Sequence, residues 1–364
     1  MTLSAESDLK QSIGAVQLPG IGHSVADVGR VARADVDGKK ASIEIELGFP
    51  ASGIHSELVQ AVTEAVQKTA EFDDVAVILR TRITAHGVQR NLKPLDNVNN
   101  IVAIASGKGG VGKSTTAVNL ALALAAEGAN VGILDADIYG PSIPLMLGVS
   151  SERPTSDDGK SMNPLSAHGI QVMSIGFLID ADQPMVWRGP MVTQALNQML
   201  QQTKWTDIDY LIVDMPPGTG DIQLTLSQQV PVSGVVIVTT PQEIALLDAR
   251  KGLQMFRKVL VPVLGIVENM STHICTKCGH EEPLFGSGGG AQLAADYEVE
   301  LLGSLPLDLR IREQTDSGNP SVVAEPGEAP AAAYRATARR MAARLAMQGK
   351  DYSRRFPKIV VENK

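Results

Sequence analysis

The sequence has few cysteines, few aromatic residues, no excess of basic residues and no long apolar run. Aromatic residues make up 4% of the chain and the formal net charge is −8, which argues against an aromatic or basic surface for nucleic acid. No apolar run approaches the ~18 residues of a membrane-spanning helix, and the N-terminus lacks the apolar core of a signal peptide. We therefore expect a cytoplasmic protein that contacts neither nucleic acid nor membrane. Its only two cysteines, Cys275 and Cys278, are then metal or redox groups rather than a structural disulfide.

The first 88 residues read as a separate small α+β domain. The expected order is helix, strand, strand, helix, strand, at residues 4–16, 29–36, 40–47, 52–69 and 75–83. Residues 85–100 are polar, contain a proline and show no periodicity, and we assign residues 89–99 as the linker. Residues 349–364 are expected to form a flexible tail.

Residues 100–348 form the second expected domain, in which strands alternate with helices. The expected strands are 101–105, 130–134, 169–174, 210–213, 235–239, 263–267 and 301–305. Several are almost continuously apolar, which is typical of parallel strands covered on both faces. The alternation predicts an α/β fold with a doubly wound, mostly parallel sheet that binds nucleotide at the carboxyl ends of its strands. The last helix, within residues 328–348, has an apolar stripe that we interpret as packing.

A phosphate-binding loop follows the first of these strands. Residues 107–114 read GKGGVGKS and fit the P-loop pattern G-x-x-x-x-G-K-[ST], between an apolar strand and a helix-forming run. Glycines let backbone N–H groups approach phosphate oxygens, and the following helix N-terminus favours an anion. We expect Lys113 to contact the β- and γ-phosphates and Ser114 to bind Mg²⁺. The candidate nucleotide-binding residues of the loop are Gly107, Lys108, Gly109, Gly110, Val111, Gly112, Lys113, Ser114 and Thr115.

Two later strands end in carboxylates. Asp135 and Asp137 follow the end of the second strand, and their side chains lie on the same side of the sheet. We expect Asp135 either to be a ligand of Mg²⁺ or to stabilise the loop that follows the strand. Asp214 ends an apolar strand in the Walker B manner and is predicted to bind Mg²⁺. The glycine- and proline-rich turn after it, residues 215–221, is predicted to sense the γ-phosphate, with a backbone contact from Gly218.

The cysteine pair lies in the segment HICTKCGH, and its C-x-x-C spacing suits a soft metal. In one interpretation His273, Cys275, Cys278 and His280 form a one-chain zinc site. In the other, two chains each supply one cysteine pair to a four-iron cluster, which requires a homodimer because the chain has no further cysteine. A thioredoxin-like redox pair is disfavoured, since that motif lies near the start of a compact βαβ domain.

A second lysine in the loop, Lys108, makes it resemble the deviant Walker A group of ATPases. This group includes nitrogenase iron protein, the Min-system ATPase and the ParA partition proteins. The resemblance implies that Lys108 crosses a dimer interface and contacts the partner's nucleotide. Two unrelated features, Lys108 and the lone cysteine pair, thus favour the same two-fold symmetry.

Five motifs in order resemble the bacterial Mrp/ApbC iron–sulfur cluster carrier ATPases: GKGGVGKST, DADIYGPS, MVWRGPM, DMPPGTGDIQLT and VENMSTHICTKCGH. The resemblance implies a homodimer that holds a bridging 4Fe–4S cluster, hydrolyses ATP slowly with Mg²⁺ and transfers the cluster to apo-proteins. It also implies scaffold or donor proteins of cluster assembly as partners. Related sequences often carry proline where Thr276 stands here, a departure that we expect to affect loop stiffness rather than ligation.

The same resemblance assigns roles to residues. It implies that Lys108, Lys113 and Asp137 are catalytic, with Asp137 positioning the attacking water, and that Asn269 and Pro306 contact adenine. The N-terminal domain is similar to small iron–sulfur-assembly domains but lacks their reactive cysteine, so we assign it no catalytic role. The alternative function is a partition- or septum-type ATPase with a structural zinc knuckle. The acidic charge and the weakly amphipathic last helix count against this alternative.

Overall fold

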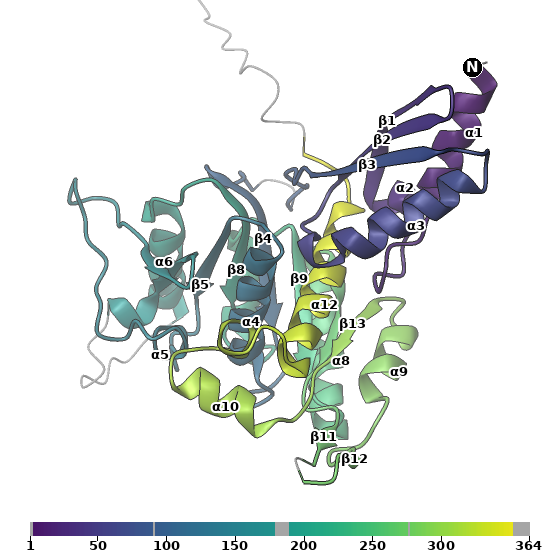
Figure 1. Cartoon of the computed structure of the whole chain (residues 1–364). Helices are drawn as coiled ribbons and strands as arrows, with labels where there is room; N and C mark the ends of the chain where they lie inside the picture. The colour runs from purple at the N-terminus through teal and green to yellow at the C-terminus, as the bar shows by residue number, and fades with distance from the viewer. Residues whose placement is uncertain (1–2, 90–91, 179–188, 276, 352–364) are drawn as a thin grey trace, which may run out of the picture.

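The computed structural model describes residues 3–89, 92–178, 189–275 and 277–351, which form a small N-terminal unit and a large α/β unit (Figure 1). The N-terminal elements are α1 (Leu3–Gly14), α2 (Val25–Val28), β1 (Gly29–Asp37), β2 (Lys40–Leu47), the 3-10 helix η1 (Ser52–Ile54), α3 (His55–Gln67) and β3 (Asp74–Thr81). The sheet has the order β1-β2-β3, with β1 antiparallel and β3 parallel to β2. This confirms the expected helix–strand–strand–helix–strand order, to which the structure adds the short α2.

Alternation and helical spacing account for the core of the N-terminal unit. Ile43, Ile45 and Leu47 point to one face of β2 and are fully buried. Leu58, Val62 and Val66 repeat at helical spacing along α3 and are also fully buried. The two sets are the inner faces of the sheet and of the helix that packs on it.

The large unit is built on an eight-stranded sheet with the order β13-β10-β9-β4-β8-β5-β7-β6. Its strands are β4 (Val98–Ala105), β5 (Val131–Asp135), β6 (Leu165–Ala167), β7 (Ile170–Ser174), β8 (Ile208–Asp214), β9 (Gly234–Thr239), β10 (Val263–Glu268) and β13 (Glu300–Ser304). Neighbouring strands are parallel except for the edge strand β6, which is antiparallel to β7. All seven expected strands are present, and β6 was not foreseen.

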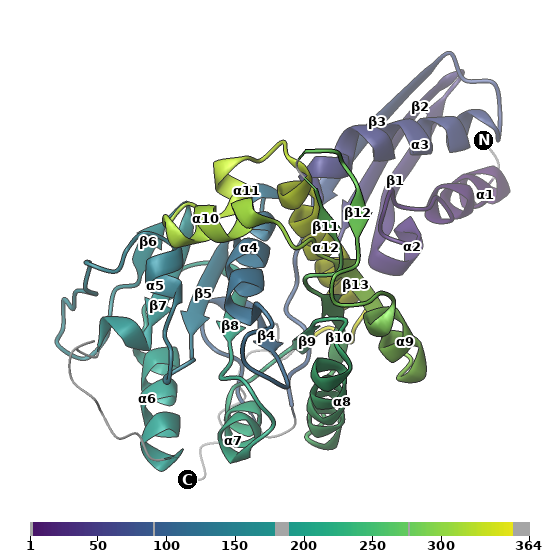
Figure 2. The same ribbon diagram turned by 90° about the horizontal axis from the view of Figure 1, so that it is seen from below.

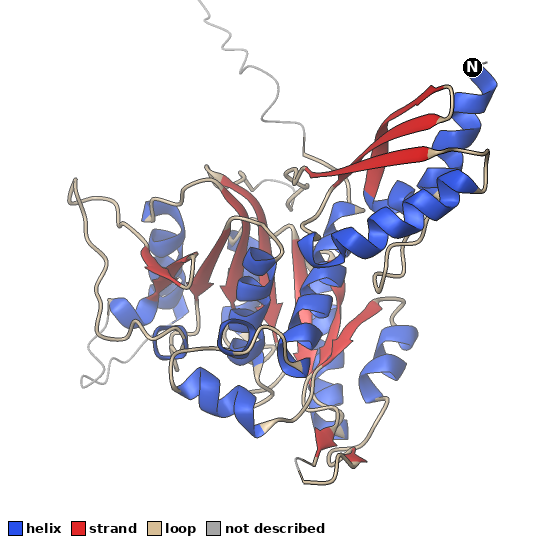
Figure 3. Cartoon of the chain, in the orientation of Figure 1, coloured by secondary structure: helices blue, strands red, loops and turns tan. Residues whose placement is uncertain are grey.

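Helices cover both faces of this sheet. They are α4 (Lys113–Ala126), α5 (Ile143–Met146), α6 (Gly189–Gln202), α7 (Asp221–Gln229), α8 (Glu243–Lys258), α9 (Gly289–Asp296), α10 (Leu309–Asp316), α11 (Ser321–Ala324) and α12 (Ala329–Ala346), with the 3-10 helix η2 (Ile175–Phe177). Figure 2 shows α4, α10, α11 and α12 on one face and α6, α7 and α8 on the other. The strands therefore form a middle layer (Figure 3), and the doubly wound prediction is confirmed. No helix among the described residues is long and apolar enough to cross a membrane.

The connection between the two units differs from the expected linker. Strand β4 begins at Val98, so the last residues assigned to the linker are part of the sheet. His86 is buried, and its ring Nδ1 lies 2.9 Å from Oδ1 of the buried Asn100 in β4. The segment before the linker is thus fastened to the large unit, while residues 90–91 and 352–364 lie outside the described residues.

Two other expectations concern the C-terminal half of the chain. The stripe on α12 packs inward, because Tyr334, Met341 and Leu345 are fully buried, which confirms the packing interpretation. Most of the MVWRGPM motif falls outside the described residues, and its last three residues begin α6.

Candidate nucleotide and metal-binding site

The P-loop joins the end of β4 to the start of α4, the strand–loop–helix context that the motif requires. Close approach of neighbouring segments explains two of its glycines. A Cβ on Gly107 would lie 2.2 Å from the carbonyl carbon of Asp248 in α8. Gly112 has φ +81°, and a Cβ there would lie 2.1 Å from Nδ2 of Asn269. The loop therefore packs against α8 on one side and against the end of β10 on the other.

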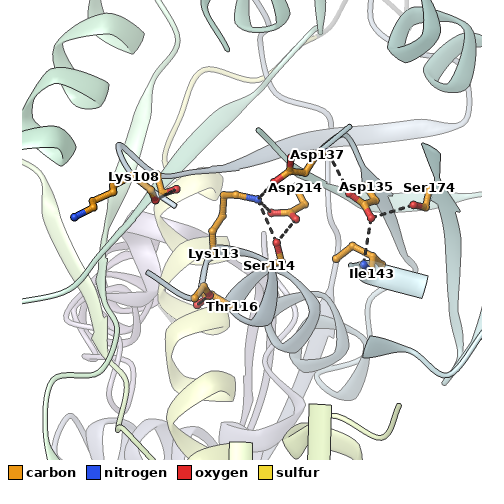
Figure 4. Close-up of polar contacts among 11 residues, drawn as sticks. Lys108, Lys113, Ser114, Thr116, Asp135, Asp137, Ile143, Ser174 and Asp214 are labelled. Carbon is orange, nitrogen blue, oxygen red and sulfur yellow. Dashed lines mark hydrogen bonds and ion pairs between the residues drawn. The ribbon is translucent and has the colours of Figure 1, made fainter. Parts of the chain in front are cut away.

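A lysine and two carboxylates meet directly beside the loop (Figure 4). Nζ of Lys113 lies 2.6 Å from Oδ1 of Asp214 and 3.6 Å from Oδ2 of Asp137. Ser114 Oγ donates a hydrogen bond of 2.6 Å to the other oxygen of Asp214. The predicted phosphate lysine, magnesium serine, Walker B carboxylate and water-positioning carboxylate are thus brought together. They come from three neighbouring strand ends, those of β4, β5 and β8.

Burial shifts the pKa values of these carboxylates. Burial raises the pKa of Asp214, and the neighbouring Lys113 opposes the shift by stabilising the ionised form. Burial likewise raises the pKa of Asp137, again against Lys113. The second oxygen of Asp137, Oδ1, is buried and has no hydrogen-bond partner among the described residues. Ser114, Asp214 and this free oxygen form an oxygen-rich set that fits a hard cation such as Mg²⁺ and a hydrogen-bonded water.

Asp135 is fully buried, as is Asp214, and its carboxylate is engaged in local hydrogen bonds. Its Oδ1 accepts from Asp137 N at 3.1 Å, and its Oδ2 accepts from Ile143 N at 3.2 Å and Ser174 Oγ at 3.0 Å. Burial, reinforced by Asp214, raises the pKa of Asp135 to about 7. These contacts favour the second of its two expected roles, holding the loop that carries Asp137. The magnesium role of Asp135 stays a prediction.

Two adjoining cavities open from the P-loop. The first, of about 220 Å³, is lined by Lys113, Ser114, Asp137 and other loop residues and suits phosphates. The second, of about 210 Å³, is lined by both polar and apolar residues, Asn269 and Pro306 among them, but most of its wall area is apolar, which suits a nucleotide base. Gly112, Thr115 and Met146 line both. The predicted base-contacting residues therefore lie beside the predicted phosphate-binding loop.

The sequence did not point to several side chains in these walls, including those of Pro217, Met146 and Tyr334. Pro217 lines the phosphate cavity, Met146 lines both cavities, and Tyr334 lines the base cavity. Pro217 directly precedes the predicted Gly218 in the turn of residues 215–221, so the same motif could have predicted it. Met146 and Tyr334 come from α5 and α12, and no local pattern marks them.

The turn after Asp214 is folded against the base of the P-loop. Gly218 has φ +103°, and its N–H donates to the carbonyl of Ser106 at 2.9 Å. The predicted contact from this N–H to the γ-phosphate therefore requires a movement of the turn and stays a prediction.

Lys108 behaves differently from Lys113. It is exposed, and Figure 4 shows its side chain pointing away from Lys113 and the carboxylates. Its backbone is fixed, because Ser106 Oγ donates to its carbonyl at 2.9 Å. Lys113 thus forms the ion pairs with the chain's own acidic cluster. The ammonium group of Lys108 is exposed and can contact another molecule.

The cysteines lie on a small hairpin formed by β11 (His273–Ile274) and β12 (Glu281–Glu282), which we call the cysteine hairpin. Cys275 N donates to His280 O at 2.9 Å, and Gly279 N donates to Cys275 O at 2.8 Å. Cys278 is exposed and Cys275 is half-buried. Backbone N–H groups of Lys277 and Cys278 lower the pKa of the Cys275 thiol, which favours the thiolate that binds metals.

The one-chain zinc interpretation finds no support in this hairpin. The Nδ1 atom of His273 lies 3.0 Å from the carbonyl oxygen of Leu307. Within the described part of the chain, no group of three or more His, Cys, Asp or Glu side chains is placed to hold a metal ion. Thr276, where related sequences often have proline, lies outside the described residues.

Comparisons with known proteins agree with this geometry. The family described as NUBPL iron-transfer P-loop NTPase matches residues 97–342, and the family described as iron-sulfur cluster assembly protein matches residues 6–79. An Escherichia coli K12 protein named iron-sulfur cluster carrier protein is 62% identical over 260 residues, which cover 71% of this chain and 70% of that protein. A protein of the same name from Haemophilus influenzae is 48% identical over 349 residues, covering 96% and 94%.

A solved structure gives the same result for the fold. The nucleotide-binding protein from Archaeoglobus fulgidus, in complex with ADP, is 38% identical with a TM-score of 0.54, covering 61% of this chain and 88% of that one. The extent of the family match and the identity to relatives over most of their length leave one conclusion. This chain belongs to the family of NUBPL iron-transfer P-loop NTPases.

Proposed function

We propose that this chain is a cytoplasmic ATPase that carries a 4Fe–4S cluster, holds it between two copies of itself and transfers it to apo-proteins. The observation that carries the proposal is the cysteine hairpin. It presents two thiols, with no third metal-binding side chain grouped beside them among the described residues. Two thiolates are half of the ligand set of a four-iron cluster. A second copy related by a two-fold axis supplies the other half.

Exposed apolar side chains near the hairpin support a face for the second copy. In and just after the hairpin, Ile274 is 45% exposed and Leu284 51%; at the start of α8, Ile244 is 63% exposed and Leu247 49%. The loop after β12 approaches the residues just before α8, because a Cβ on Gly286 would lie 3.9 Å from the carbonyl oxygen of Pro241. Apolar groups gathered on a surface are typical of an interaction site. Lys108 projects from the loop that packs on the same helix α8.

The acidic cluster supports ATP hydrolysis. Lys113 supplies positive charge to the phosphates, and Ser114 and Asp214 hold Mg²⁺, which neutralises charge on the phosphoryl oxygens when bound. Asp137 accepts a hydrogen bond from the attacking water through its unpartnered Oδ1. Lys108 of the second copy adds a further cation at the nucleotide. A slow rate, set by assembly of the two copies, suits a switch rather than a motor.

The segment after β10 offers a route from nucleotide to cargo. Asn269 donates from Nδ2 to the carbonyl of Val111 in the P-loop at 2.9 Å. The same segment runs directly into the cysteine hairpin. A shift of the P-loop on hydrolysis would therefore move the hairpin and change the spacing of the two cysteine pairs. Cluster affinity would then depend on the nucleotide, which is the differential affinity that coupling requires.

Reconstitution with iron and sulfide under anaerobic conditions tests the cluster. We expect an absorbance band near ~400 nm and about four iron atoms per two chains. Cys275→Ser and Cys278→Ser should abolish the band, whereas Lys277→Ala, an exposed neighbour that is no ligand, should keep it. Stoichiometric zinc with no such band would instead favour the zinc-knuckle ATPase and overturn the proposal.

Cluster transfer tests the coupling. Transfer to an apo-acceptor protein is measured with ATP, without nucleotide, and for the variant Lys113→Ala. We expect ATP to change the transfer rate in the wild type and to have no effect in the variant. Equal rates in all three experiments would leave the carrier role intact but exclude nucleotide control.

A further inference from the structure

The wall of the base cavity includes a buried tyrosine whose hydroxyl group has no partner among the described residues. Tyr334, in the first turns of α12, is fully buried and lines this cavity. Its hydroxyl has no hydrogen-bond partner among the described residues. Buried hydroxyls in proteins are nearly always hydrogen-bonded, because an unpaired one costs folding stability. An exception in the wall of a ligand cavity points to a partner supplied by the ligand.

Other polar side chains of the same wall already have partners. Asn269 Nδ2 donates to the P-loop carbonyl of Val111. Thr315 Oγ1 donates to the carbonyl of Ile311 at 2.6 Å. Asp308 binds the guanidinium of Arg310, with the two groups 2.8 Å apart. Among the buried polar atoms of this wall, the Tyr334 hydroxyl is the one that the described contacts leave unpaired.

The surroundings of Tyr334 suit a flat, largely apolar group with polar edges. Met270, Leu307 and Ile311 line the cavity with it, while Tyr334 is absent from the wall of the phosphate cavity. Burial raises the pKa of Tyr334, so the phenol stays protonated and can both donate and accept. A purine base presents both acceptor nitrogens and an amino donor on its edge.

We propose that the Tyr334 hydroxyl recognises the base of the bound nucleotide through a hydrogen bond to the edge of adenine. The proposal rests on the proposed ATP-binding function and adds a residue from the C-terminal helix to it. Recognition of this kind links α12 to the nucleotide. It makes affinity depend on the base and not on the phosphates alone.

Equilibrium binding of three ligands tests this proposal by calorimetry. The ligands are a non-hydrolysable ATP analogue, ribose triphosphate without a base, and inorganic tripolyphosphate, each with Mg²⁺. The test variant is Tyr334→Phe, which removes one oxygen and keeps the ring. The matched control is Thr337→Val, which removes a buried hydroxyl one turn along α12. That hydroxyl donates to Ala333 O at 2.8 Å and lies outside the cavity wall.

We expect Tyr334→Phe to weaken binding of the ATP analogue by about three- to tenfold, the usual worth of one neutral hydrogen bond. Binding of the two base-free ligands should not change, and Thr337→Val should leave all three affinities unchanged. The melting temperature of Tyr334→Phe without nucleotide should equal or exceed that of the wild type, because an unpaired buried hydroxyl has been removed.

Three results with the variant Tyr334→Phe would overturn the proposal. These are unchanged affinity of Tyr334→Phe for the ATP analogue, an equal loss for the base-free ligands, or a melting temperature several degrees below the wild type. A wild type that binds tripolyphosphate as tightly as the ATP analogue would exclude base recognition but not phosphate binding. A wild type that binds none of the ligands would overturn the ATPase function itself.

Discussion

At the scale of single residues, one buried lysine lies beside several buried carboxylates at the phosphate end of the site. Lys113 is 6% exposed and Asp214 fully buried, and their charged atoms are 2.6 Å apart. Asp137 and Asp135 follow on the adjoining strand end, and burial raises the pKa of both. Such a cluster is unfavourable without cations. Its position beside a phosphate-binding loop agrees with the proposed roles of holding Mg²⁺ and orienting a water.

Replacing Lys113 by methionine should remove the charge that contacts the phosphates while keeping a similar side-chain length. We expect ATP hydrolysis to fall at least about 100-fold, the usual loss when one preorganised electrostatic contact is removed. The same substitution at Lys251, an exposed lysine paired with Asp248 on α8, should leave the rate within about twofold. Phosphate-release assays on both variants measure this. Equal losses would mean that the change acts through general stability.

His86 predicts how stability depends on pH. Burial lowers the pKa of His86, so the folded state favours the neutral ring that bonds Asn100. A lowered pKa contributes stability above the unfolded-state value of about 6.5, and this stability is lost as the pH falls below it. We therefore expect the wild type to lose more unfolding free energy than His86→Gln between about pH 7.5 and pH 5.5. Urea unfolding at both pH values measures the difference, and parallel losses would exclude His86 as the cause.

At the scale of elements, helix α4 joins the nucleotide site to the N-terminal unit. Its N-terminus carries Lys113, and its last turn is capped by Glu127, whose side chain is fully buried. Glu127 accepts from Arg335 at 2.8 Å and Arg339 at 2.6 Å on α12, and from the backbone N–H of Gly53 at 2.6 Å. One carboxylate thus holds together the P-loop helix, the C-terminal helix and the N-terminal unit.

Glu127→Gln should destabilise the chain strongly. It removes the charge that two arginines share away from solvent, and breaking a buried ion pair costs about 3–5 kcal/mol. The control is Glu300→Gln, because Glu300 also connects the two units, through His23 at 3.1 Å and Arg344 at 3.4 Å, but is 32% exposed. Its loss should stay below about 1 kcal/mol. Denaturant unfolding distinguishes the two variants, and similar losses would show that burial is not the deciding factor.

At the scale of the whole molecule, two features of one chain fit the proposed second copy. The cysteine hairpin offers two ligands, and Lys108 is exposed and points away from the chain's own acidic cluster. Exposed apolar side chains lie on the hairpin and on α8. The P-loop that carries Lys108 packs on α8 at Asp248, and the loop after the hairpin approaches Pro241, just before α8.

Mixing two inactive variants tests this arrangement. Lys108→Ala keeps its own phosphate site but lacks the lysine for its partner, and Lys113→Ala has the opposite defect. If Lys108 acts across a two-fold axis, a mixed dimer contains one complete site. An equal mixture should then recover about a quarter of the wild-type hydrolysis rate, because half of the dimers are mixed and each has one working site. No recovery after subunit exchange, in a sample shown to be dimeric, would assign Lys108 to its own subunit's site.

Much of the fold and of the phosphate site could be predicted from the sequence, because both rest on local patterns. The seven parallel strands are runs of apolar residues, and Gly107 to Ser114 form a motif with a fixed geometry. What escaped prediction depends on long-range contacts. The short β6 has no periodicity of its own, the role of Asp135 depends on Ser174 and Ile143, and the linker boundary depends on pairing of Val98 with Ile208.

The sequence by itself determined the order of the strands along the chain, the phosphate loop and the scarcity of metal ligands. Each of these is written in residue types at fixed spacing. Only the tertiary structure decided which side chains line the same cavity and which charged groups form ion pairs. Tyr334 and Asn269 line the same base cavity, and Glu127 lies between Gly53 and Arg339. The physical reason is that packing brings together segments that are remote in sequence, and spacing along the chain does not record that closeness.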